Sequence, residues 1–162
     1  MNPPKTSDRK KRTNKAMPPV AAGYSGTPLS KKLGIKPGQQ VWLIAAPEHY
    51  PEYLQPLPTG VKLHELTSSR TSMNIDPNID MVHLFTSQQT DLQKKLQQLR
   101  QSLASHIPVW VSWPKKSSGV PSSVTEDTIR QAALPLGYVD IKVCAVDLTW
   151  SALKLVVRKE LR

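Results

Sequence analysis

The residues best suited to binding chemistry form a short basic loop. Residues 109–113 are almost entirely apolar and are followed by Pro114. The next five residues combine ammonium, hydroxyl and small groups: Lys115, Lys116, Ser117, Ser118 and Gly119. Such donors suit an anion, for example a phosphate or a carboxylate. The structural alternative, in which both lysines are simply solvated at the end of a strand, is the more common arrangement.

Three further residues could complete a site around this loop. Asp147 could orient one of the lysines, and Trp150 offers a flat surface to an aromatic ring or a cation. Trp150 could equally pack against the core, since large aromatic side chains bury well without any site. Tyr24 lies between Gly23 and Gly26, whose backbone freedom permits a lid over a site or only the start of the domain.

Other signatures of an enzyme are sparse. The four histidines are scattered, and no spacing joins them with Cys144 or paired acids into a metal site. Among them, His83 lies in an apolar strand pattern and is expected to be a hydrogen-bonded core residue. Cys144 also lies in a strand pattern, without the basic surroundings of a reactive thiol. We therefore expect no catalytic residue, no metal and no bound cofactor, and an enzymatic role stays uncertain.

A separate basic segment opens the chain. Residues 1–22 carry six basic side chains against Asp8, a net charge of +5 out of +10 for all 162 residues. The segment is rich in proline and polar residues, so we expect a disordered arm. It could attract nucleic acid phosphates without sequence preference, or it could act only as a solubilising terminus. The residues concerned are Arg9, Lys10, Lys11, Arg12 and Lys15.

Size and cysteine content limit the cellular setting. Residues 23–162 suffice for one domain with its own core. Cys144 is the single cysteine, so no internal disulfide can form, and a reducing, cytoplasmic location is expected. The apolar run over residues 41–46 is far too short to cross a membrane.

Strand and helix patterns alternate from residue 38 onward. Helical spacing of leucines predicts a helix over residues 87–105. A second helix, over residues 125–134, follows a capping-box pattern that begins at Ser123. Shorter helices are expected over residues 28–33 and 48–55. The expected strands cover residues 41–46, 61–66, 81–85, 109–113, 139–146 and 153–157.

The composition of these strands predicts their places in a sheet. The first, third and fourth are apolar on both faces and should be central, whereas the others alternate and should be peripheral. In the fifth, Ile141 and Val143 should face inward and Asp140 and Lys142 the other way. The last two strands are joined by too few residues for a parallel crossover and must pair antiparallel. The sequence thus predicts a three-layer, Rossmann-like α/β fold: a mostly parallel sheet of about six strands with a C-terminal antiparallel hairpin.

Three segments carry a resemblance to a known family. They are GYSGTPLSKKLGIKPGQQVWLIAAPE (residues 23–48), VWVSWPKKSSGV (109–120) and TEDTIRQAALPLGYVDIKVCAVDLTWSALKLVVRK (125–159). Together they resemble an uncharacterised bacterial family of unknown function, whose members show GYSGTPL and KLGIK-G, then WPKK-SG, then CA-D-TWSGLKFV-R. One departure is Ala152, where the family usually has glycine. The resemblance covers nearly all of the expected domain.

The layout of this family is similar to that of a shortened class I methyltransferase. The resemblance implies a strand order of 2-1-3-4-6-5 and a site at the carboxyl ends of the strands, where the order reverses. It also exposes a difference, because the loop after the first strand holds Pro47, Glu48 and His49 in place of the glycines that adenosylmethionine needs. Glu65 stands where a ribose-binding acid could lie, although one such residue is more often a surface charge.

These features favour a non-catalytic ligand- or partner-binding module on a degenerate methyltransferase-like fold. The expected partners are a small anionic ligand or a protein, and no membrane. Two alternatives stay open. One is a nucleic-acid-associated protein that uses its basic arm, and the other is an enzyme that acts on a small anionic substrate with Lys115, Lys116 and Asp147.

Overall fold

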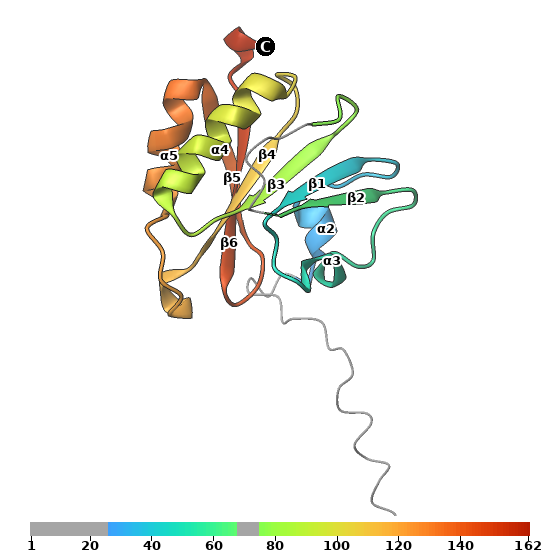
Figure 1. The fold of residues 1–162 in the computed structure, drawn as a ribbon. Coiled ribbons are helices and arrows are strands. Elements are labelled where there is room, and N and C mark those ends of the chain that lie inside the picture. Colours follow the sequence, from blue (N-terminus) through green and yellow to red (C-terminus); the bar gives the residue numbers. More distant parts are fainter. Residues whose placement is uncertain (1–25, 68–74) are drawn as a thin grey trace, which may run out of the picture.

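A six-stranded mixed sheet forms the centre of the protein. The computed structural model describes residues 26–67 and 75–162. Tyr24 and the basic arm therefore lie outside the described residues. The strands, in their order across the sheet, are β2 (Lys62–Leu66), β1 (Gln40–Ile44), β3 (Met81–Phe85), β4 (Val109–Pro114), β6 (Trp150–Val157) and β5 (Tyr138–Ala145). The first four run parallel, and β6 is antiparallel to both of its neighbours (Figure 1). The predicted fold class and strand order are confirmed.

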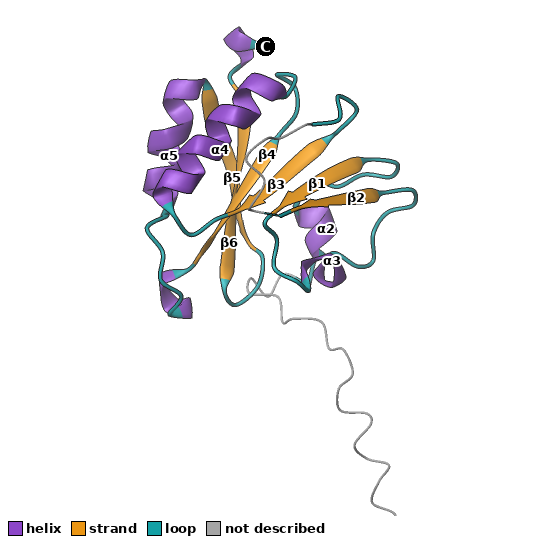
Figure 2. Ribbon diagram, viewed as in Figure 1, coloured by secondary structure: helices purple, strands orange, loops and turns teal. Residues whose placement is uncertain are grey.

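Helices cover both faces of this sheet, as Figure 2 shows. One face carries α4 (Gln89–Ser102) and α5 (Glu126–Ala133), and the other carries α2 (Leu29–Lys32) and α3 (Tyr50–Tyr53). Three 3-10 turns complete the described elements: η2 (Lys116–Ser118), η3 (Leu134–Leu136) and η4 (Lys159–Leu161).

Two apolar cores separate these layers. The core under α4 and α5 contains Leu92, Leu96 and Leu99, which are completely buried. Burial of one leucine side chain contributes about 1.5–3 kcal/mol, so this helix face is a major source of stability. The core under α2 and α3 contains Trp110 and Tyr50. Strands β1, β3 and β4 are buried from both sides, which confirms their predicted central position.

Local proline chemistry shortens one predicted helix. The helix expected over residues 48–55 is the single turn α3, Tyr50–Tyr53. Pro51 is tolerated because it lies in the first turn, where its missing N–H would have no partner. Pro56 follows closely and disfavours helical geometry at Gln55. The chain therefore leaves the helix after one turn.

The start of α5 also differs from the prediction. Its N-cap is Thr125, whose hydroxyl accepts a hydrogen bond from the Thr128 N–H, while Thr128 Oγ1 accepts one from the Thr125 N–H. The predicted capping box that began at Ser123 is therefore wrong. The hydroxyl of Ser123 instead accepts a hydrogen bond from the Gln89 N–H at the start of α4.

A bulge reverses the predicted facing of residues in the edge strand β5. The register shifts between Asp140 and Lys142, so one extra residue lies opposite β6. Ile141 and Val143, expected to face inward, are 57% and 52% exposed. Because a bulge shifts the side-chain alternation by one residue, a period-two pattern misassigns the faces beyond it.

In the described residues, no helix combines the length and apolar character needed to span a bilayer.

Candidate functional site

The candidate site lies at the carboxyl ends of the parallel strands. Strand β1 pairs with β2 on one side and β3 on the other, so the strand order reverses there. In open α/β sheets, ligands bind beyond the carboxyl ends of the strands at such a reversal point. Four segments form this edge, which we call the rim: residues 45–49, 86–88, 115–119 and 147–149.

The loop after β1 is closed by bulky or restricted residues. Ala45 has a φ of 57°, and its N–H donates to the Leu66 carbonyl at 2.8 Å. A residue with a Cβ in this left-handed conformation is strained by about 1–2 kcal/mol. Pro47 follows, and its carbonyl accepts the N–H of Tyr50, which is only 1% exposed. The backbone therefore turns sharply after β1 and directs a tyrosine ring into the protein.

That tyrosine begins a buried hydrogen-bonded chain. Tyr50 Oη lies 2.7 Å from His83 Nδ1, and His83 Nε2 lies 2.7 Å from Ser112 Oγ. Burial lowers the pKa of His83 to about 3, so its ring is neutral and donates to one hydroxyl while it accepts from the other. Burial also raises the pKa of Tyr50 well above its ordinary value, with smaller contributions from Cys144 and Asp147. The chain joins α3, β3 and β4.

Aromatic packing extends this chain toward the rim. Phe85 stacks on His83 with ring centroids 4.3 Å apart, and its other contacts are edge-on to Tyr50 and Trp150. Trp150, proposed from the sequence as a binding surface, is half-buried, and its ring centroid lies 5.2 Å from that of Phe85. The space below the β1 loop is thus filled by aromatic side chains.

The first lysine of the predicted anion loop is tied to the β5–β6 turn. Lys115 Nζ donates to the backbone carbonyl of Asp147 at 2.8 Å, and the Lys115 N–H donates to the Thr149 carbonyl at 2.7 Å. The Asp147 carboxylate accepts the N–H groups of Thr149 and Trp150. Asp147 does hold a lysine, as the sequence suggested, but through its backbone. Its side chain closes the turn.

The rest of the loop is more open. Ser118 Oγ donates to the Lys115 carbonyl and accepts the Val120 N–H, so this hydroxyl is engaged locally. Gly119 has a φ of 77°, a conformation that favours glycine and ends η2. Lys116 and Ser117 are exposed. The fold therefore brings Lys115, Asp147 and Trp150 together and leaves Lys116 and Ser117 as accessible donors beside them.

A second polar group at the rim was missed by sequence reasoning. Thr86 Oγ1 donates to Asp91 Oδ2 at 2.8 Å, and Lys95 Nζ lies 3.2 Å from Asp91 Oδ1. Lys95 is only 4% exposed, and its ammonium makes no hydrogen bond of acceptable geometry. Lys95 falls three residues after Leu92, on the buried stripe of the helix. A lysine at a position where the helical spacing expects an apolar residue was the one sign in the sequence that this group is buried.

Other predicted or implied groups lie apart from this arrangement. Glu65, the residue compared with a ribose-binding acid, is exposed on the outer strand β2. His49 lies in the β1 loop, within 4 Å of Glu48 and Glu52 at the surface. Within residues 26–67 and 75–162, no three histidine, cysteine, aspartate or glutamate side chains gather into a metal-binding group.

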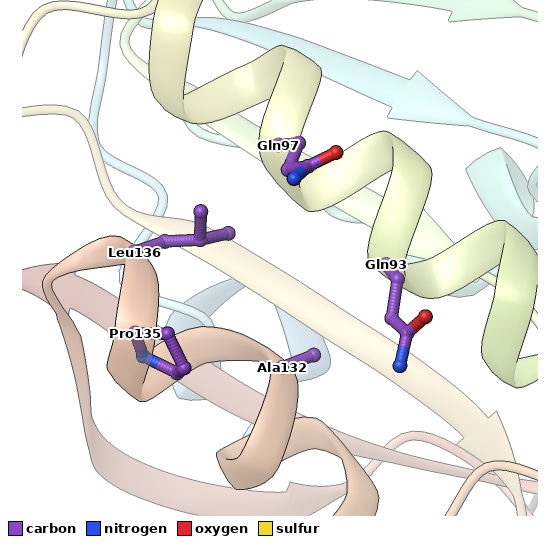
Figure 3. Close-up of a pocket in the computed structure, with 5 residues that line it drawn as sticks. All are labelled: Gln93, Gln97, Ala132, Pro135 and Leu136. Atoms are coloured by element: carbon purple, nitrogen blue, oxygen red, sulfur yellow. The ribbon is translucent and has the colours of Figure 1, made fainter.

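Two surface hollows lie away from the rim. One, of about 270 Å³, lies between α4 and α5 and is lined by Gln93, Gln97, Ala132, Pro135 and Leu136 (Figure 3). A larger one, of about 430 Å³, is lined by residues of α2 and its neighbours: Pro28, Ser30, Lys31, Ile35, Pro56, Leu57 and Pro58. Neither contains a residue of the predicted anion loop.

Solved structures of similar fold include methyltransferases. One is a SAM-dependent methyltransferase from Aquifex aeolicus, with a TM-score of 0.59 and 12% identity over 79% of this chain and 87% of that chain. Another is the Methanococcus jannaschii fibrillarin pre-rRNA processing protein, with a TM-score of 0.53 and 9% identity over 81% of this chain and 76% of that one. At these identities the likeness shows the fold alone.

Sequence comparison gives a family without a known activity. None of the curated proteins matches the chain. Residues 30–159 match the family described as "Protein of unknown function (DUF3052)". That span includes every described strand and the whole rim, and it agrees with the family resemblance of the three sequence motifs. The chain therefore belongs to this family of unknown function, on a class I methyltransferase-like fold.

Proposed function

We propose that this protein is a non-catalytic binding module that holds a small anionic ligand at the rim of its sheet. The observation that carries the proposal is the closed loop after β1. Adenosylmethionine binding in this fold needs glycines that let the cofactor approach the backbone. Here Ala45, Pro47 and the buried Tyr50 occupy that region. The framework is kept while the cofactor position is filled.

The open part of the anion loop is the best-placed ligand site. The exposed ammonium of Lys116 and the hydroxyl of Ser117 lie next to Lys115, which is fixed by the Asp147 carbonyl. Charge-assisted hydrogen bonds to a carboxylate or phosphate are about twice as strong as neutral ones. A fixed loop with free donors can therefore hold an anion without any rearrangement of the sheet.

Catalysis at this rim has less support. His83, the residue best suited to general acid–base chemistry, is 1% exposed and held neutral between Tyr50 and Ser112. It cannot reach a substrate outside the core. Cys144 is half-buried and free, and burial raises the pKa of its thiol, against the effect of Lys32 and Lys142. A protonated, unpaired thiol supports a reducing, cytoplasmic location and disfavours a nucleophilic role.

Titration with inorganic phosphate and with citrate, followed through backbone amide shifts in NMR spectra, tests this proposal. We expect saturable shifts at residues 116–119. Lys116→Ala should weaken binding by about tenfold to a hundredfold, since one charge-assisted hydrogen bond contributes about 1.5–3 kcal/mol. Lys116 is a cleaner choice than Lys115, whose removal would also loosen the β5–β6 turn.

Lys94→Ala, an exposed lysine on α4, is the matched control and should bind as the parent does. Equal titration curves for the parent protein and Lys116→Ala would show that the loop is solvated surface. Shifts centred on other segments would place the anion elsewhere. Either result would remove the proposed site.

A further inference from the structure

Four lysines gather where α2 meets the C-terminal hairpin. This set, which we call the α2-side lysine cluster, comprises Lys32, Lys36, Lys142 and Lys154. Lys142 Nζ donates to the Lys32 carbonyl at 2.8 Å. Lys142 and Lys154 are direct cross-strand partners in β5 and β6. Lys154 Nζ lies beside Gly34, two residues before Lys36. Residues distant in the sequence thus place their positive charges on one surface.

The charge of this cluster is held in place and not neutralised. None of the ion pairs among the described residues includes any of its four lysines. Like charges directly opposite each other on antiparallel strands are destabilising. Burial lowers the pKa of Lys154, and repulsion from Lys142 and Lys36 lowers it further. The repulsion among these lysines destabilises the isolated protein, and the binding of an anionic partner would reduce that repulsion.

Local contacts show how the fold tolerates the repulsion. The ammonium of Lys154 lies 5.8 Å from the centroid of the Trp110 ring, a cation–π arrangement. The carbonyl that receives Lys142 ends the short helix α2, where backbone acceptors are unused. These contacts orient the two side chains and leave their charges intact. Lys36 and Lys142 are exposed, so a large partner can reach them.

We propose that the α2-side lysine cluster binds the phosphate backbone of a nucleic acid without sequence preference. Four lysines from α2, the loop that follows it, β5 and β6 match the repeating phosphates of a nucleic acid better than a single small anion. Trp110 is completely buried under Lys154, so it offers no surface on which a base could stack. The contact would therefore involve backbone charge alone. This surface is separate from the rim, and the inference does not depend on the rim ligand.

The basic N-terminal segment precedes α2 in the sequence by only a few residues and adds positive charge to the chain. Residues 1–22 carry a net charge of +5, and α2 begins at Leu29, seven residues after their end. The helix that follows the basic segment thus carries Lys32 and is closely followed by Lys36. The net positive charge of the whole chain favours the approach of an extended anionic partner, while the proposed contact is formed by the four lysines of the cluster.

A membrane surface fits this cluster less well. Basic protein segments that bind membranes combine positive charge with apolar side chains that enter the bilayer. None of the large exposed apolar residues of the described chain belongs to α2: Val120, Leu134, Ile141, Val143, Leu148 and Leu161. Val143 lies opposite Leu153 of the α4–α5 core, and Lys142 lies opposite Lys154 on the other face. Ile141, the bulged residue before Lys142, is the remaining exposed apolar side chain of β5, and one aliphatic side chain is a weak anchor beside four lysines.

Fluorescence anisotropy with a labelled DNA duplex of mixed sequence tests the inference on the full chain. The variant Lys32→Gln/Lys36→Gln/Lys142→Gln removes three charges of the cluster and keeps the partly buried Lys154. A matched variant, Lys62→Gln/Lys94→Gln/Lys159→Gln, removes three exposed charges elsewhere. Thermal unfolding of each protein confirms that it is folded.

We expect the cluster variant to bind at least about tenfold more weakly than the matched variant at low salt. Each phosphate contact contributes about 0.9 to the slope of log K against log salt, so three lost contacts reduce that slope by nearly 3. Equal losses in the two variants would assign binding to net charge and overturn the inference. Undetectable binding of the parent protein, or cluster-dependent binding only to vesicles of phosphatidylcholine and phosphatidylserine, would overturn it as well.

Discussion

His83 connects three parts of the fold at the scale of single residues. Its two ring nitrogens bond Tyr50 of α3 and Ser112 of β4, while its own strand, β3, occupies the centre of the sheet. A neutral imidazole satisfies both neighbours, whereas a protonated ring would place an uncompensated charge in an apolar core. The sequence indicated a hydrogen-bonded core histidine, and this is confirmed. Its partners could not be read from the sequence, because they lie 33 and 29 residues away.

The stability of the protein should therefore fall in mild acid. His83 has a pKa of about 3 in the folded protein and about 6.5 when unfolded, so between these values the unfolded chain binds the extra proton. The contribution of neutral His83 is complete above about pH 6.5 and decreases as the pH falls toward 3. Its full loss corresponds to on the order of 5 kcal/mol. Urea unfolding between about pH 7.5 and pH 4 measures this effect.

His83→Gln provides the comparison that isolates this residue from the carboxyl groups. The variant should be less stable than the parent near neutral pH, and the difference between the two should shrink as the pH falls. Parallel stability curves for the parent and His83→Gln would contradict the assignment of a buried, neutral histidine.

Lys95 shows a limit of sequence reasoning at the same scale. A lysine on the apolar stripe of a helix is usually read as a solvated residue at the edge of that stripe, since its long side chain can reach water. In the structure it is 4% exposed and lies beside Asp91. Whether a lysine at this position reaches solvent depends on what packs over the helix, and the helix pattern does not contain that information.

The β5–β6 hairpin is the element that shapes the candidate anion loop. Its turn accepts Lys115 through two backbone carbonyls and is closed by the Asp147 carboxylate. Lys115 thereby becomes part of a rigid support, and Lys116 and Ser117 are presented beside it. The loop is defined by contacts between residues 115 and 149, so its sequence alone does not show which lysine is free.

Replacement of Asp147 should destabilise the β5–β6 turn, by an amount that depends on whether the new side chain can still accept hydrogen bonds. Asp147→Ala leaves the N–H groups of Thr149 and Trp150 without their acceptor, and we expect a loss of about 1–3 kcal/mol in the free energy of unfolding. Asp147→Asn keeps one side-chain oxygen as acceptor and should lose clearly less. Urea unfolding of the two variants gives both values. Equal losses would show that the carboxylate charge, not the hydrogen bonds, stabilises the turn.

Elements with strong periodicity were predicted well, and those decided by neighbours were not. The helix α4 and the strands β1, β3 and β4 were placed correctly because their apolar patterns record burial on one or both sides. The length of α3, the cap of α5 and the exposed face of β5 were wrong. A proline decides where α3 ends, a threonine hydroxyl caps α5, and a bulge sets the faces of β5. The spacing of apolar residues in the sequence does not reveal any of these three features.

At the scale of the whole molecule, the protein has a class I methyltransferase-like fold, and we propose that the region where such a fold would hold its cofactor is filled. Burial patterns correctly predicted that β1, β3 and β4 are central, but they counted β6 as peripheral although it is paired on both sides. The family resemblance supplied the full order, 2-1-3-4-6-5, which the structure confirms. The missing glycines after β1 were visible in the sequence. The packing of Tyr50 on His83 and Phe85, which supports this proposal, was not visible in the sequence.

Isothermal titration of the full chain with S-adenosylmethionine tests the central claim most directly, with S-adenosylhomocysteine as a second probe. We predict no saturable heat for either compound. Ala45→Gly, which relieves the backbone strain after β1, should also fail to bind, because the proposed obstacles, Pro47 in the loop and the buried Tyr50 after it, are unchanged. Stoichiometric, saturable binding of S-adenosylmethionine by the unmodified protein would contradict the account, since the loop after β1 would then accept the group that it is inferred to exclude.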